Sequence, residues 1–76
     1  MVNPNGLTMQ PAIMPLEEID SEADYVLYSI DDGLVSEHFT EGEARLAFYK
    51  QAAAKALGQQ IPLVYERQET VWVPLA

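Results

Sequence analysis

A single helix-forming segment lies in the middle of this 76-residue chain and limits the folds open to it. Residues 40–43, TEGE, match a capping box, in which the Thr40 hydroxyl accepts from the Glu43 amide and the Glu43 carboxylate bonds back to the Thr40 amide. The Ala-rich run that follows is made of good helix formers, and Gly58 stands where a left-handed cap belongs. We therefore expect a helix over residues 41–57, with an apolar side formed by Leu46, Tyr49, Ala52, Ala53, Ala56 and Leu57.

Two pairs of strand-like segments flank this helix. Residues 25–30 and 34–39 are rich in aromatic and β-branched side chains, and the Asp-Asp-Gly between them is a strong hairpin signal. Residues 61–66 and 70–73 have the same character around a turn at 67–69. The order β-β-α-β-β predicts an α+β domain, a small antiparallel sheet of two hairpins with one helix packed on one face.

The loop length of the first hairpin decides which side chains share a face. A two-residue loop at Asp32 and Gly33 pairs Asp31 with Leu34 and places Glu37 opposite Tyr28. A three-residue loop reverses the faces, so the register of this hairpin stays open.

The N-terminal residues 1–22 have a different composition from residues 23–76, which we expect to form the single domain. Prolines at positions 4, 11 and 15 exclude a helix interior and a regular central strand. We expect residues 1–22 to be a flexible or extended arm that ends in an acidic stretch.

One helix covers one face of a four-stranded sheet, and the second face is too apolar to face water. If Leu63 and Tyr65 point toward the helix, side chains that alternate with them point away. Either the arm or another subunit must then cover that face. We expect a homodimer through this uncovered sheet face, with four interface candidates, Trp72, Tyr25, Leu27 and Val64.

The charges are segregated along the chain. Ten of the twelve carboxylates lie between residues 17 and 43, and all four basic residues follow. The net charge of −8 disfavours direct binding to nucleic acid or to an anionic membrane, because both need a positive surface. Four of the ten acids have local roles in the turn or at the helix start. The other six serve either solubility alone or a docking surface for a protein partner, in particular a basic one: Glu17, Glu18, Asp20, Glu22, Asp24 and Glu37.

The residues that usually carry chemistry are sparse. His38 is the one histidine and the chain has no cysteine, so a zinc site has too few ligands. On a strand, Glu37 and His38 point to opposite faces and do not form a side-by-side pair. Residues 20–24 imitate the start of a calcium loop, but Tyr25 stands where glycine is required. We predict no catalytic residue, no cofactor and no metal site.

These features favour a non-catalytic protein-interaction module. We expect a cytoplasmic protein, because residues 1–6 lack the positive flank and apolar core of a signal peptide and no apolar run is long enough to span a bilayer. The alternative is an acidic inhibitor that mimics nucleic acid, of the kind that mobile elements and viruses encode. A third hypothesis is an enzyme. Its active site would have to form at a dimer interface from residues such as His38, Glu37 and Tyr28.

Overall fold

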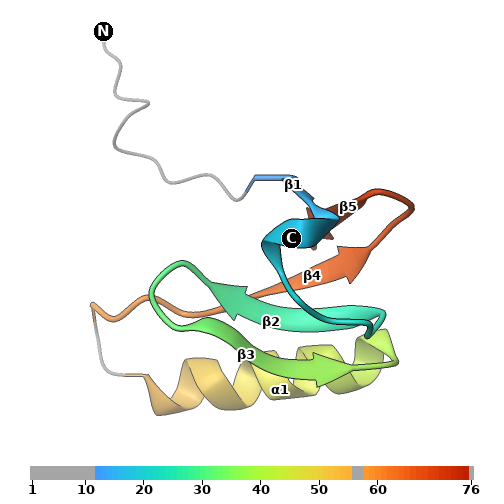
Figure 1. Ribbon diagram of the computed structural model, residues 1–76. Helices are drawn as coiled ribbons and strands as arrows, with labels where there is room; N and C mark the ends of the chain where they lie inside the picture. The colour runs from blue at the N-terminus through green and yellow to red at the C-terminus, as the bar shows by residue number, and fades with distance from the viewer. Residues whose placement is uncertain (1–11, 56–57, 76) are drawn as a thin grey trace, which may run out of the picture.

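The computed structural model describes residues 12–55 and 58–75 (Figure 1). The elements are β1 (Met14–Pro15), the 3₁₀ helix η2 (Leu16–Glu18), β2 (Tyr25–Ser29), β3 (Gly33–His38), α1 (Glu41–Ala54), β4 (Leu63–Arg67) and β5 (Val71–Pro74). The five strands form one sheet in the order β1-β5-β4-β2-β3, and every neighbouring pair is antiparallel. From β2 onward the order is β-β-α-β-β, which confirms the predicted α+β fold class.

Helix α1 begins at the predicted cap. The Thr40 side chain accepts a hydrogen bond from the Glu43 amide at 3.2 Å, and Thr40 itself has an extended backbone. The helix ends at Ala54 instead of residue 57, because Lys55 adopts an extended conformation with ψ of 142°. Gly58 has the predicted left-handed conformation, with φ of +91°, but it lies beyond the helix end. Ala56 and Leu57 lie outside the described residues.

The predicted apolar side of the helix is wrong. The side that packs on the sheet carries the buried Ala44 together with Ala47 and Phe48, whereas Leu46 is 56% exposed and Tyr49 is 62% exposed. The two alanines allow the helix backbone to approach the sheet closely, so small residues rather than the largest apolar ones mark the buried stripe.

The first hairpin has a three-residue loop, one of the two alternatives that the sequence left open. Ser29 pairs with Gly33, which leaves residues 30–32 in the loop, and the φ of +74° at Gly33 accounts for the glycine there. The Ser29 hydroxyl accepts from the Asp32 amide at 2.9 Å. With an irregularity farther along the pair, Val26 lies opposite Glu37. Both side chains therefore lie on the same face of the sheet.

Each face of the sheet packs against another part of the chain. On the α1 side the buried residues are Leu27, Ala44 and Val64. On the opposite side they are Ile19, Ala23, Val26, Tyr65 and Trp72. Ile19 and Ala23 belong to the segment before β2, so residues 14–23 begin as the edge strand β1 and then cross the sheet as a third layer on the side away from α1 (Figure 1). We call this layer the strap.

The strap overlaps with the part of the predicted arm that the structure describes. Residues 12–22 of that arm contain β1 and η2 and pack on the domain, and residues 1–11 lie outside the described residues. Within the described ranges, no helix combines the length and the apolar character needed to cross a membrane.

Candidate functional site: the acidic strap face

Three of the four predicted interface residues are buried within a single copy of the chain. Trp72 is 0% exposed on the strap side, while Leu27 at 0% and Val64 at 4% lie between the sheet and α1. Tyr25 is half-buried on the α1 side. The second hairpin pairs Arg67 with Trp72, so the grouping of Trp72 with Val64 on one outward face is wrong. A partner could contact these three buried side chains only if the strap or α1 moved away.

Trp72 shows how the strap closes the sheet. The indole Nε1 donates to the Leu16 carbonyl at 3.1 Å, and the Leu16 amide donates to the Thr70 carbonyl at 3.3 Å. Next to these bonds, Met14 pairs with Trp72 in the short β1–β5 ladder. The buried indole thus has a partner for its N–H group, as a buried tryptophan requires. The sheet face that the sequence left uncovered is occupied by the chain's own strap.

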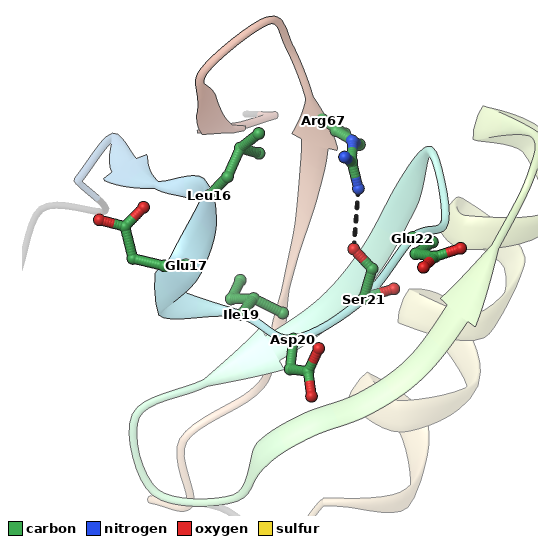
Figure 2. A pocket seen from close by; sticks show the side chains of 7 residues that line it. All are labelled: Leu16, Glu17, Ile19, Asp20, Ser21, Glu22 and Arg67. Atoms are coloured by element: carbon green, nitrogen blue, oxygen red, sulfur yellow. Dashed lines mark hydrogen bonds between the residues drawn. The ribbon is translucent and has the colours of Figure 1, made fainter.

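Arg67 fixes the second half of the strap. Its amide donates to the Asp24 carbonyl at 2.8 Å, and its Nη1 donates to the Ser21 carbonyl at 2.8 Å (Figure 2). The guanidinium also lies 6.0 Å from the centre of the Trp72 ring, within cation–π range. The Ser21 hydroxyl in turn donates to Glu37 Oε1 on β3 at 2.6 Å. The strap is therefore tied to β3 and to β4 by polar contacts as well as by apolar packing.

Apolar and acidic residues alternate along the strap. Ile19 and Ala23 point inward and are buried, and the acids between and after them are exposed. Five of the six predicted docking carboxylates lie on the strap or directly after it, and the sixth, that of Glu37, is joined to the strap through Ser21. We call them the acidic strap face: Glu17, Glu18, Asp20, Glu22, Asp24 and Glu37. None of the six has an ion-pair partner among the described residues.

An open hollow of about 620 Å³ lies on this face. It is lined by Leu16, Glu17, Ile19, Asp20, Ser21, Glu22 and Arg67. Figure 2 shows the carboxylates of Glu17, Asp20 and Glu22 pointing in different directions rather than toward one point. In the described part of the chain, no group of three or more histidine or acidic side chains could hold a metal ion. The arrangement suits separate contacts along an extended surface better than enclosure of one small cation.

A second polar cluster lies on the α1 side of the sheet, and our sequence reasoning missed it. The Ser36 hydroxyl and His38 Nε2 are 2.8 Å apart, and the Tyr25 hydroxyl donates to Glu66 Oε2 at 3.3 Å. Cross-strand pairing places His38, Tyr25 and Glu66 in one row. The pKa of the Tyr25 phenol is raised, mainly because the phenol is partly buried and to a smaller extent because the charge of Glu66 lies nearby. The i, i+2 spacing of Ser36 and His38 on a strand is the signal that could have predicted their contact.

This cluster does not amount to a catalytic triad. A catalytic triad consists of a hydroxyl, an imidazole in hydrogen-bond contact with it, and a carboxylate that orients the imidazole. The cluster contains the first two. No carboxylate bonds to His38 among residues 12–55 and 58–75. The strap face is therefore the better candidate for a functional surface.

No protein-family model, curated protein or solved structure matches this chain.

Proposed function

We propose that this protein is a non-catalytic interaction module that binds a basic partner protein through the acidic strap face. The observation that carries the proposal is a set of six carboxylates, none with an ion-pair partner in the described chain, on and beside a strap that buried contacts hold in place. A cytoplasmic location is part of the same proposal.

Electrostatic attraction would bring a basic partner to the acidic strap face. A patch of like charges raises the local concentration of oppositely charged partners and accelerates their encounter. The apolar side chains of the strap are used internally against Trp72 and Val26, so its outward side is polar. Binding at this face should accordingly weaken as salt is added, because exposed charges are screened.

The experiment is an affinity capture from host extract at low and at high salt, with three forms of the protein. The Asp20→Asn/Glu22→Gln variant removes two charges from the strap face, and Asp31→Asn/Glu69→Gln removes two exposed charges elsewhere. We expect a basic protein that is captured by the wild type and by the second variant, lost with the first, and released by salt.

Equal capture by both variants would contradict the role of the strap face. If the captured protein binds nucleic acid and DNA or RNA displaces the module from it, the mimicry alternative replaces the proposal. If no protein is captured and the purified protein converts a small molecule of the extract into a product, an enzyme would be favoured instead.

A further inference from the structure

The outer face of α1 carries an apolar seam with no described element beyond it (Figure 1). Its residues, Gly42, Leu46, Tyr49 and Ala53, are all exposed, and their spacing of four, three and four residues is that of a coiled-coil seam. The Tyr49 ring stands edge-on to the half-buried Phe48 ring at 5.5 Å, which orients it. At Gly42 an added Cβ would meet nothing within 4 Å, so this position is open to a neighbour.

Two opposite charges lie beside this seam. Glu43 and Lys50 each follow a seam residue and are seven residues apart, so they lie on the same flank two turns from each other. Neither side chain has an ion-pair partner among the described residues. The other two basic residues of this region are paired, Arg45 with Glu41 at 2.7 Å and Lys55 with Asp32 at 3.0 Å.

We propose that two copies of this chain associate through the outer faces of α1, with the two helices antiparallel. Reversal of one helix places Gly42 opposite the partner's Ala53 and Leu46 opposite the partner's Tyr49. The same reversal brings Glu43 beside the partner's Lys50, and symmetry forms this ion pair twice. The small residues at both ends of the seam allow the helices to approach closely.

The charge distribution selects a second copy as the occupant. Residues 41–55 hold three of the four cations and only two of the twelve carboxylates, so the remainder of the chain has ten carboxylates and one cation. Two copies therefore repel each other least where their helices meet. A seam of four residues on a helix about 21 Å long is small, and the dimer it forms dissociates readily on dilution.

Analytical ultracentrifugation of the full chain at concentrations up to about 500 µM tests this proposal. The range extends this high because a small interface dissociates at low protein concentration. We expect a reversible dimer for the wild type. Glu43→Lys and Lys50→Glu each place like charges in contact twice, and each should weaken association by about tenfold or more. An equimolar mixture of the two variants places opposite charges in both contacts, so it should associate to within about threefold of the wild type.

Glu69→Lys is the matched control, because it makes the same charge change at an exposed position outside α1 and should leave the dimer intact. Far-UV circular dichroism of each variant shows that α1 is retained. A wild type that is monomeric throughout the range overturns the proposal, as does a mixture that fails to associate or an equal loss with Glu69→Lys. Loss of the dimer with Asp20→Asn/Glu22→Gln would mean that α1 pairs with the strap of a second copy instead. The test requires no basic partner, so its result is independent of the proposed function.

Discussion

At the scale of single residues, Trp72 connects the strap to the sheet. It is the only tryptophan in the chain, it is 0% exposed, and it donates a hydrogen bond to a strap carbonyl. Arg67 is placed beside it and donates hydrogen bonds to the carbonyls of Ser21 in the strap and of Asp24 directly after it. Substitutions at these positions should therefore act on folding before they act on any association between molecules.

Trp72→Glu should unfold the protein rather than dissociate it. Loss of a buried tryptophan costs roughly 3–5 kcal/mol, and an unpaired carboxylate in its place adds a desolvation cost. That total is a large part of the stability of a domain of this size. Urea denaturation followed by circular dichroism measures it, with Trp72→Phe as the conservative control. A folded Trp72→Glu protein with an unchanged midpoint would contradict the burial of this residue.

Tyr65 should contribute to a loss of stability at alkaline pH. Burial, followed by the proximity of Tyr28, raises the pKa of the Tyr65 phenol above its usual value of 10.0. A group whose pKa is higher in the folded state contributes stability that is complete below the unfolded pKa and is lost as the pH rises through the folded pKa. The free energy of unfolding should thus fall above about pH 10, and Tyr65→Phe should make that fall smaller. An identical pH profile for the two proteins would exclude this contribution.

At the scale of elements, the chain order and the helix start followed from local signals, and the side-chain faces did not. The TEGE cap and the strand propensities act over a few residues, so they could be predicted. The hairpin register depended on one extra loop residue and on the irregularity between Leu27 and Tyr28, which together place Glu37 opposite Val26 instead of Tyr28. The buried side of α1 depended on how closely Ala44 and Ala47 could approach the sheet, which no local pattern encodes.

The loop of the first hairpin can be tested at Gly33. Its φ of +74° lies in the left-handed region, so Gly33→Ala should destabilise the protein by about 1–2 kcal/mol. Gly42→Ala is the matched control, because Gly42 lies in α1 with nothing within 4 Å of an added Cβ, and it should stabilise by up to about 1 kcal/mol. Denaturant midpoints at low micromolar protein compare the two variants. Equal shifts of the same sign would contradict the loop assignment.

The candidate site could be predicted only in part, because some of its contacts join residues that are far apart in the sequence. Five of its six carboxylates are close together in the sequence, so their grouping could be predicted. Glu37 was included only because no local role explains it, and its position beside the strap depends on the hairpin register and on the hydrogen bond from Ser21, which are tertiary features. The burial of Trp72 was equally beyond local reasoning, because its partner Leu16 is 56 residues away.

At the scale of the whole molecule, three layers leave two free surfaces of opposite character. Among the described residues, the strap packs on one face of the sheet and α1 on the other. What remains outside is an acidic strap face and an apolar helix seam flanked by Glu43 and Lys50. A partner of basic charge and a second copy of the chain would accordingly bind at different places.

The central claim is that residues 14–23 of the same chain, and no second subunit, bury Trp72. The emission of this single tryptophan, recorded with its acrylamide quenching across a dilution series from the dimer to the monomer, tests it most directly. We predict a blue-shifted, weakly quenched emission that stays constant on dilution, because α1 and not the sheet forms the association surface. A red shift with increased quenching as the protein dissociates would place Trp72 at the subunit interface and contradict the account.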